Sequence, residues 1–186
     1  LGAQLPDMAE AEIGGGGSAL REALEGSGVA PGDAARLHFW AAVGWGGWSR
    51  SHGLLDAVRK GIAGRILENG RVAAALEPGV DRGGPLRLLA RLHAELPRVP
   101  FVSGWVDRSR ALRAAERALG IAPDFAGNPL TLALTILDVD PSQRARARRL
   151  LEQAAAVEPV GAHVVELAAI RERARERLAS LEADGR

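Results

Sequence analysis

The sequence predicts an α+β fold that is mostly helical and has a small C-terminal sheet containing a β-α-β unit. Apolar residues recur at helical spacing over most of the chain. Near the C-terminus, two apolar segments rich in β-branched residues flank one amphipathic helix. With 186 residues, 47% of them hydrophobic, the chain is long and apolar enough to form a folded domain.

Four consecutive glycines at residues 14–17 predict a flexible linker, because glycine loses the most conformational entropy on ordering. The linker ends an N-terminal arm, residues 1–17, and a helical domain is expected at residues 18–129. The β-α-β unit and a C-terminal helix then occupy residues 130–186. Ser18 can cap a short first helix at residues 19–25.

The helical domain continues with a predicted helix at residues 31–43, where Pro31 stands in the first turn. The Gly-Trp-Gly-Gly-Trp segment at residues 44–48 should end that helix. The next helix is expected from a Ser51 cap through residue 67, and Asn69-Gly70 is a strong stop signal for it.

Proline, glycine and aspartate mark the remaining boundaries of this domain. Residues 77–85 are predicted as a loop, residues 86–96 as an amphipathic helix and residues 100–106 as a short extended segment. Asp107 should cap a further helix at residues 108–119.

The last third of the chain contains the predicted sheet. Residues 130–137 and 160–167 are expected to be strands, and residues 142–157 form the helix between them. The length of that helix suits the right-handed crossover of a β-α-β unit. A final helix at residues 168–181 carries an apolar stripe.

Composition excludes several classes of protein. There are no cysteines, which excludes disulfides, thiolate zinc sites and cysteine nucleophiles. The 24 Lys and Arg residues nearly balance 23 Asp and Glu, so the net charge of +1 does not call for nucleic acid, an anionic membrane or an acidic substrate as a partner. No apolar run approaches membrane-helix length, and residues 1–13 carry acids where a signal peptide needs positive charge. We expect a soluble intracellular protein or part of an assembly made inside a cell.

Signals for catalysis or cofactor binding are few. His52 and Asp56 are four residues apart, so a helix would place an imidazole and a carboxylate on one face. A surface pair is the preferred interpretation, and a catalytic dyad remains the alternative. No metal-ligand spacing, serine-nucleophile motif or phosphate-binding loop is present, and we expect no cofactor and no metal.

Trp40, Trp45 and Trp48 lie within nine residues among glycines. Anchoring of a helix-loop-helix in the core is preferred over a ligand cage, and an interface role is also open because tryptophan dominates contact hot spots. Arginines cluster at residues 144–149 and 171–177, but they are spread around their helices and the second group alternates with glutamates. A solvated, ion-paired face is preferred there over nucleic-acid binding.

Residues 39–48, Phe-Trp-Ala-Ala-Val-Gly-Trp-Gly-Gly-Trp, are similar to the tryptophan-rich segment of the bacteriophage tail protein I family, a baseplate wedge component. Residues 57–62, Ala-Val-Arg-Lys-Gly-Ile, and residues 69–74 resemble segments that follow in that family. Residues 158–167 resemble a C-terminal strand of related baseplate proteins. Residues 77–129 match nothing in the family, and the resemblance covers about half of the chain. It implies a structural protein without catalysis.

The sequence therefore predicts a non-enzymatic structural component of a phage or phage-like contractile tail baseplate, which acts through protein–protein contacts in the virion. Its partners are expected to be other assembly subunits and copies of itself, with no membrane and no nucleic acid. The residues predicted to make these contacts are Trp40, Trp45, Trp48, Arg59, Ile170, Leu178 and Leu181. The alternatives are a small enzyme or ligand-binding domain that uses His52 and Asp56, and an arginine-rich nucleic-acid adaptor.

Overall fold

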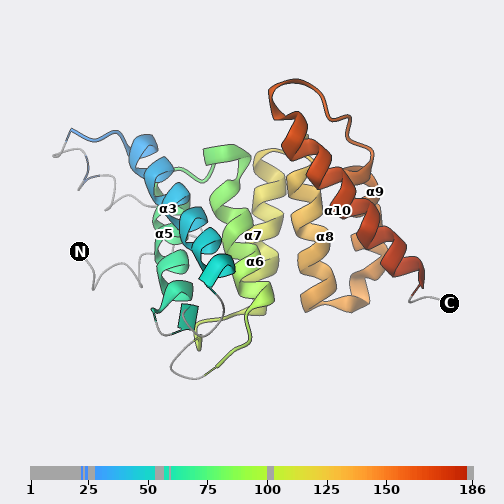
Figure 1. The fold of residues 1–186 in the computed structure, drawn as a ribbon, viewed down its shortest axis with the longest axis horizontal. Coiled ribbons are helices and arrows are strands. Elements are labelled where there is room, and N and C mark those ends of the chain that lie inside the picture. The colour runs from blue at the N-terminus through green and yellow to red at the C-terminus, as the bar shows by residue number, and fades with distance from the viewer. Residues whose placement is uncertain are drawn as a thin grey trace.

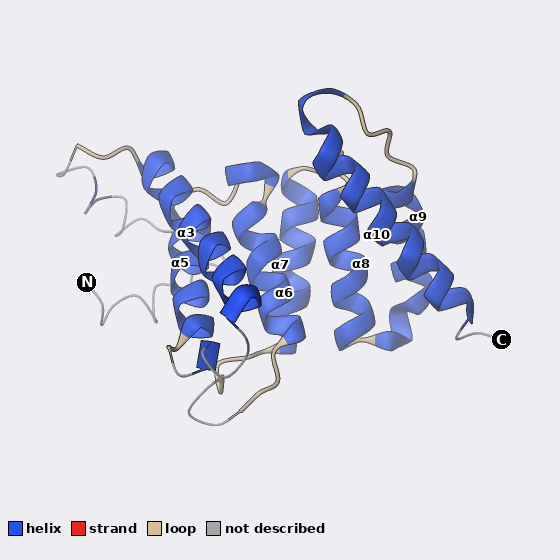
Figure 2. Ribbon diagram, in the orientation of Figure 1, coloured by secondary structure: helices blue, strands red, loops and turns tan. Residues whose placement is uncertain are grey.

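The computed structural model describes residues 22, 24, 28–52, 57–58, 60–99 and 103–183. Every regular element in these ranges is a helix, and none is a strand (Figure 2). The predicted α+β class with its C-terminal β-α-β unit is therefore wrong, and the described fold is all-α. The predicted arm and linker at residues 1–17 and the Ser18 cap lie outside the described residues.

The described helices form a row that follows the chain. They are α3 (Pro31–His52), α5 (Ile62–Leu76), α6 (Gly84–Glu95), α7 (Arg108–Ile121), α8 (Gly127–Val139), α9 (Arg144–Ala155) and α10 (Val164–Ala183). Short 3-10 helices, η1 (Val80–Arg82), η2 (Pro141–Gln143) and η3 (Gly161–His163), lie in the connections. Successive helices pack against each other, so α3 lies at one end of the row and α9 and α10 at the other (Figure 1). No helix among the described residues is long and apolar enough to cross a bilayer.

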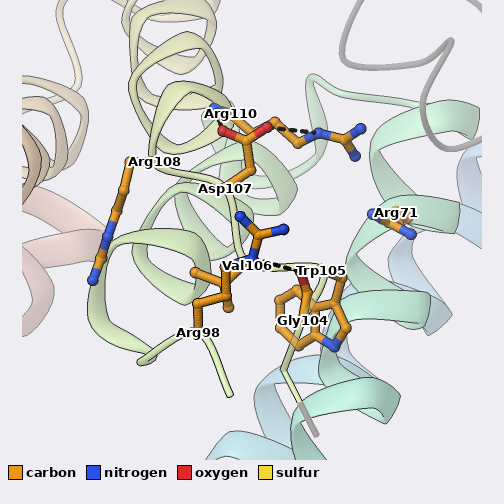
Figure 3. Close-up of a pocket in the computed structure, with 8 residues that line it drawn as sticks. All are labelled: Arg71, Arg98, Gly104, Trp105, Val106, Asp107, Arg108 and Arg110. Atoms are coloured by element: carbon orange, nitrogen blue, oxygen red, sulfur yellow. Dashed lines mark hydrogen bonds and ion pairs between the residues drawn. The ribbon is translucent and has the colours of Figure 1, made fainter. Parts of the chain in front are cut away.

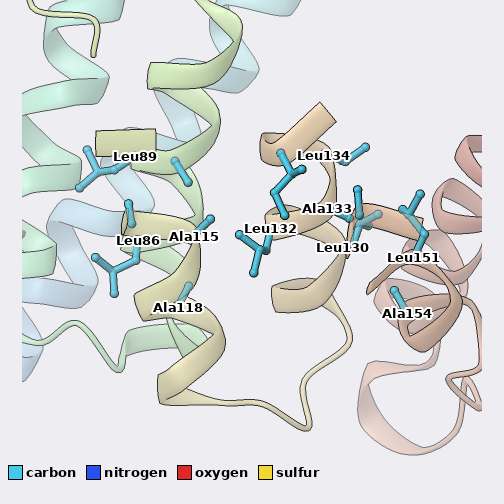
Figure 4. Packing of buried hydrophobic residues seen from close by; sticks show 14 of the residues in the cluster. Leu86, Leu89, Ala115, Ala118, Leu130, Leu132, Ala133, Leu134, Leu151 and Ala154 are labelled. Atoms are coloured by element: carbon cyan, nitrogen blue, oxygen red, sulfur yellow. The ribbon is translucent and has the colours of Figure 1, made fainter. Parts of the chain in front are cut away.

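Two groups of buried side chains hold the row together. The larger one joins α5 to α10 and includes Leu86, Leu132 and Leu151, which are fully buried (Figure 4). The smaller one lies between α3, α5 and η1, where Phe39 packs with Leu76. Burial of apolar surface from both sides of each inner helix is what stabilises this arrangement.

The tryptophan-rich segment is helical, so the predicted break at residues 44–48 is wrong. α3 continues through it to His52. Hydroxyl groups of Ser49 and Ser51 donate to the carbonyl oxygens of Gly46 and Gly47, at 2.9 and 3.3 Å. The intrinsic helix propensity of glycine is low, but tertiary packing can override it.

The predicted stop at Asn69-Gly70 is also wrong, because α5 runs through both residues to Leu76. A Cβ atom on Gly70 would lie 2.9 Å from Leu88 Cδ2 and 3.1 Å from Leu89 Cδ2. Gly70 therefore allows α6 to approach α5 closely, which is a packing role and not a chain-ending one. The break that does occur lies before α5, where Gly61 has a φ of +62°, and Ser51, the predicted cap, lies inside α3.

The first predicted strand, residues 130–137, lies within α8. It is apolar on all sides because α8 packs against α6, α7 and α9, and its residues are buried all around. A continuous apolar run of this length is compatible with a buried strand or a buried helix, so periodicity alone could not decide.

The second predicted strand, residues 160–167, is wrong for a different reason. It consists of η3 followed by the first turn of α10. Val160 and Val165 are exposed, so the apolar residues of this segment do not mark a core strand.

The remaining boundaries agree with the sequence more closely. The helix that ends near Pro97 and the Asp107 cap of α7 are confirmed, as are the helix α9 and the end of α10. The predicted loop at residues 77–85 is confirmed only in part, because it contains the 3-10 helix η1 and the first two residues of α6. Residues 103–105 form a turn, so the extended prediction is wrong there, and residues 100–102 lie outside the described ranges.

A partly buried polar network fixes the loop between α5 and α6. Asp81 and Arg82 have positive φ values of 48° and 56°. The Arg87 guanidinium donates to their carbonyl oxygens at 3.0 and 2.9 Å, and to Asn128 Oδ1 at 3.1 Å. Asn128, which is fully buried, donates in turn to the Arg82 carbonyl oxygen. These bonds satisfy the buried groups and tie α6 to the start of α8.

Candidate functional site

Two of the three predicted contact tryptophans pack against the chain itself. The Arg65 guanidinium lies 4.9 Å from the centroid of the Trp45 ring. The Lys60 ammonium lies 5.0 Å from the Trp48 ring, which also stacks on His52 at 4.0 Å between centroids. Cations over indole rings are stabilising contacts. Trp45 and Trp48 thus connect the C-terminal half of α3 to residues in or just before α5.

Trp40 behaves differently, because its side chain is 59% exposed. Leu37, one turn earlier, is 71% exposed, and Val43, one turn later, is also exposed. Gly44 lies beside them with no atom within 4 Å of the position a Cβ would take. We call this surface of Leu37, Trp40, Val43 and Gly44 the α3 outer face.

The other predicted contact residues do not form a second free surface. Ile170 and Leu178 are partly buried and pack against the large core group, and Leu181 belongs to that group. They hold α10 on the rest of the protein. Arg59 lies outside the described residues.

The predicted His52 and Asp56 pair is described only in part, because Asp56 lies outside the described residues. His52 Nδ1 is 3.0 Å from the Trp48 carbonyl oxygen, to which it donates, and the side chain is exposed on the last turn of α3. In the part of the chain that the structure describes, no three acidic or histidine side chains are placed to hold a metal ion.

The arginines of the α9 and α10 clusters are exposed or half-buried, and two of those on α9 form ion pairs. Arg146 and Arg148 lie 3.0 Å from Glu116 and Glu152 respectively, and Arg148 also reaches Glu182 at 3.4 Å. Exposed pairs of this kind contribute little to stability. They do leave this end of the protein with mixed charge and not with one basic face.

Sequence reasoning missed a cavity of about 470 Å³ beside the N-terminus of α7 (Figure 3). Four arginines line it, Arg71 from α5, Arg98 before the turn, and Arg108 and Arg110 from α7. Its lining also includes Trp105 and one carboxylate, Asp107. We call it the arginine pocket.

Asp107 is already engaged by its own helix. Its Oδ1 atom accepts from the amides of Ser109 at 2.8 Å and Arg110 at 3.3 Å, as a helix cap does. The Ser109 hydroxyl bond, followed by these amide bonds, holds the pKa of Asp107 below its usual value. Its Oδ2 atom lies 3.5 Å from Arg110 Nε.

Two arginines of the pocket are held by main-chain carbonyl groups. Arg98 Nε donates to the Gly104 oxygen at 3.1 Å, and Arg108 Nη1 donates to the His93 oxygen at 3.1 Å. Within the described ranges, neither guanidinium has a carboxylate within salt-bridge distance. These bonds position the side chains and leave other N–H groups of each guanidinium for a ligand.

His93 is fully buried against the lining residues. Its Nδ1 accepts from the Asp107 amide at 3.1 Å, and its ring meets the edge of Trp105 with centroids 5.5 Å apart. Burial, with the nearby charges of Arg71 and Arg110, lowers the pKa of His93 to about 4, and Asp107 opposes the shift. The ring is therefore neutral near pH 7. Since Nδ1 accepts, the proton is on Nε2, which has no acceptor among the described residues.

The signal for the arginine pocket was in the sequence but was not used. Arg98, Arg108 and Arg110 stand on either side of Trp105 within thirteen residues. Arg71 joins them only because α5 packs beside α6, which no local pattern shows.

Comparison of the chain with protein-family models, with curated proteins and with solved structures found no match.

Proposed function

We propose that this protein is an assembly subunit that acts through protein–protein contacts and pairs with a second copy of itself through the α3 outer face. The observation that carries the proposal is the exposure of Trp40 and Leu37 on a helix at the end of the row. Exposed tryptophan beside exposed leucine is typical of contact surfaces, where tryptophan often provides most of the binding energy.

The position of α3 supports this proposal. In a row of packed helices, an end helix has one face without a neighbour, and a polar outer face keeps such an end soluble. α3 packs on α5 and η1 through Ala35, Phe39 and Ala42, yet its opposite side is also apolar. A helix that is apolar on two sides is suited to a neighbour on each side.

The spacing of the residues favours a second copy. If two α3 helices pair antiparallel about a two-fold axis at Trp40, Leu37 of each copy lies opposite Val43 of the other. Such an interface uses the same surface on both copies. Gly44 has no side chain, which allows the two helices to approach closely.

Charge does not oppose this pairing. The net charge of the chain is +1, so two copies repel each other weakly. Asp33 and Arg36, which form an ion pair with each other, carry opposite charges at the edge of the face. A polar rim around an apolar centre is the usual anatomy of an interface.

The resemblance to tail protein I narrows the proposal to a baseplate of a phage or phage-like contractile tail. Its support is the segment at residues 39–48, which includes Trp40. The C-terminal segment at residues 158–167 gives less support than the sequence suggested, since residues 161–167 are helical and no part of the segment is a strand. Mass spectrometry of purified tail particles tests this narrower proposal, which is contradicted if the chain is missing from intact particles of the source organism.

Sedimentation equilibrium tests the pairing. We expect the wild-type protein to form dimers at tens of micromolar, and the double variant Leu37→Ser/Trp40→Ser to be monomeric, because the apolar centre of the face is lost. The matched control Val164→Ser/Val165→Ser removes two exposed valines at the other end of the row and should remain dimeric. Circular dichroism confirms that both variants fold. A monomeric wild type, or equal weakening by both variants, contradicts the proposal.

A further inference from the structure

We propose that a cavity at the α10 end of the row binds a small zwitterion whose carboxylate and ammonium groups are close together, as in an α-amino acid. The cavity has a volume of about 350 Å³ and lies between Arg91 of α6, Asp138 of α8 and three charged residues of α10, Arg173, Glu176 and Arg177. We call it the α10 cavity. It lies on other helices than the α3 outer face, so the proposal is independent of the α3 contact and can be correct if that contact is not.

The wall formed by α6 and α8 is held in place by Arg91. Its Nη2 donates to Asp138 Oδ2 at 2.7 Å and to Glu95 Oε1 at 2.8 Å, and its Nη1 donates to Thr135 Oγ1 at 3.4 Å. Arg91 is therefore engaged by the protein's own groups. Asp138 Oδ1, in contrast, accepts no hydrogen bond from any described residue. This wall offers a carboxylate oxygen whose position is fixed before a ligand binds.

The wall formed by α10 presents two arginines that the described residues leave unpaired. Arg173 and Arg177 are four residues apart and line the same cavity, and neither side chain forms a hydrogen bond or ion pair with another described residue. Like charges at this spacing on a helix repel each other. A carboxylate between the two guanidinium groups would offset that repulsion and use their forks of N–H donors. The two arginines therefore form the carboxylate end of the proposed site.

The same cavity also contains acceptors for a positive group. Glu176 lies beside the two arginines on α10, and its carboxylate is unpaired among the described residues. Asp138 contributes its free oxygen from α8, and the Ser180 hydroxyl also lines the cavity. An ammonium group has three donors and no acceptor, so these oxygens can satisfy it. They form the ammonium end of the proposed site.

The balance of charge favours a zwitterion over a phosphate or a dicarboxylate. Three guanidinium groups and two carboxylates line the cavity, and the guanidinium of Arg91 is already paired. A ligand with several negative charges would bring them close to both carboxylates, and a ligand with none would leave both arginines of α10 unpaired. Leu134, which is buried, adds an apolar wall that suits a small aliphatic side chain. The volume lies in the range of small-molecule sites.

Titration of the isotope-labelled protein with L-leucine, followed by amide chemical shifts at constant ionic strength, tests this proposal. We expect saturable shifts centred on α8 and α10, with a dissociation constant of about 1 mM or lower. Leucinamide lacks the carboxylate and isocaproate lacks the ammonium group. Each should bind about tenfold more weakly or worse, because it leaves one end of the site unmatched.

A pair of double variants tests the carboxylate end. Arg173→Gln/Arg177→Gln removes both guanidinium groups of the cavity and should weaken L-leucine binding by about tenfold or more. The control Arg149→Gln/Arg175→Gln removes the same charge at two exposed arginines that do not line the cavity, and should bind L-leucine as the wild type does. Circular dichroism verifies folding, which we expect because none of the four side chains is buried or paired among the described residues.

A pair of single variants tests the ammonium end. Glu176→Gln should weaken L-leucine binding without weakening isocaproate binding, and Glu172→Gln, at an exposed position of α10 outside the cavity, should change neither. Absence of saturable shifts with L-leucine, or isocaproate binding as strong as L-leucine binding, would overturn the proposal. Equal loss of L-leucine affinity in the arginine variant and its control would overturn it as well.

Discussion

The two ends of the helical row differ in the residues on their outer surfaces, which are largely charged on α10 and apolar on α3. At the α10 end, the apolar stripe of Ile170, Leu178 and Leu181 faces the core. The outer positions of this helix carry alternating arginine and glutamate, apart from Val164 and Val165 in its first turn. At the α3 end, Phe39 faces the core and Trp40, the next residue, faces outward.

This difference shows that an apolar stripe and a contact surface are distinct properties. The apolar stripe of α10 is covered by the protein's own core, and the outer side of this helix is largely charged. α3 has an internal stripe and further apolar residues, and these extra residues are what a partner could cover. The predictions below test this contrast, in order of decreasing effect.

The largest effect should come from a charge placed on the inner side of α10. Ala174 is fully buried, so Ala174→Glu places a carboxylate in the core and should lower the free energy of unfolding by more than about 4 kcal/mol. Trp40→Glu introduces the same glutamate side chain on the α3 outer face. It should change the free energy of unfolding of the monomer by less than about 1 kcal/mol. Urea unfolding followed by circular dichroism measures both. Similar losses of unfolding free energy in the two variants would contradict the proposed difference between the buried face of α10 and the exposed face of α3.

The middle of the row should be sensitive to acid because of His93. Its pKa is about 4 in the folded protein and 6.5 in the unfolded chain, so the unfolded chain binds more protons between these values. The contribution of His93 to the free energy of unfolding is fully present above pH 6.5. It should decrease by about 3 kcal/mol as the pH falls to 4. Burial of the ring is the main cause of the low pKa of His93, the charges of Arg71 of α5 and Arg110 of α7 add to it, and Asp107 opposes it.

Urea unfolding at several pH values, compared between the wild type and His93→Phe, isolates this contribution. The variant lacks the titrating ring, and its stability should depend less on pH in that window. Parallel curves for the two proteins would show that His93 is not the group responsible.

The loop before α6 should lose stability when its glycine is replaced. Gly83 has a φ of +90°, and an added Cβ would lie 3.3 Å from the Ala118 backbone of α7. Gly83→Ala should therefore cost about 2 kcal/mol, from strain and crowding together. Thermal unfolding measures the change. A variant as stable as the wild type would show that this turn can relax freely.

The smallest change in stability is expected from a substitution on the α3 outer face. Gly44→Ala should stabilise the monomer by about 0.5–1 kcal/mol, because alanine is the better helix former and its Cβ meets open space. The added methyl group should nevertheless weaken dimerisation. Gly120→Ala, at an open position in α7, should stabilise without changing dimerisation. Stability from urea unfolding and mass from sedimentation separate the two results, and unchanged dimerisation in Gly44→Ala would count against the close approach.

Local signals in the sequence predicted the elements that they control. Asp107 and Pro97 mark helix boundaries because capping and the missing proline amide act within one turn. Gly44 and Gly70 misled the prediction, because their helices are held by contacts with residues distant in the sequence, such as Arg65 and Leu88.

The class of the fold could not be predicted because α8 is buried on all sides. Its residues Leu130 to Leu137 lack the polar face that identifies most helices, and only the neighbouring helices explain its character. The arginine pocket was missed for a related reason, since it joins Arg71 to Arg108 across the packing of α5 and α6. Composition could not separate the exposed Trp40 from the half-buried Trp45, because both lie in the same glycine-rich segment.

Cysteine cross-linking tests the proposed pairing most directly, because the chain contains no cysteine of its own. Two-fold pairing at Trp40 separates the two copies of residue 36 by about 12 Å along the helix axis, since the rise per residue is about 1.5 Å. A bismaleimide of about that span should join Arg36→Cys chains into covalent dimers, and should leave Arg175→Cys chains, altered on α10, as monomers. Arg36→Cys chains that stay monomeric, or equal dimer yields from the two positions, would contradict the account.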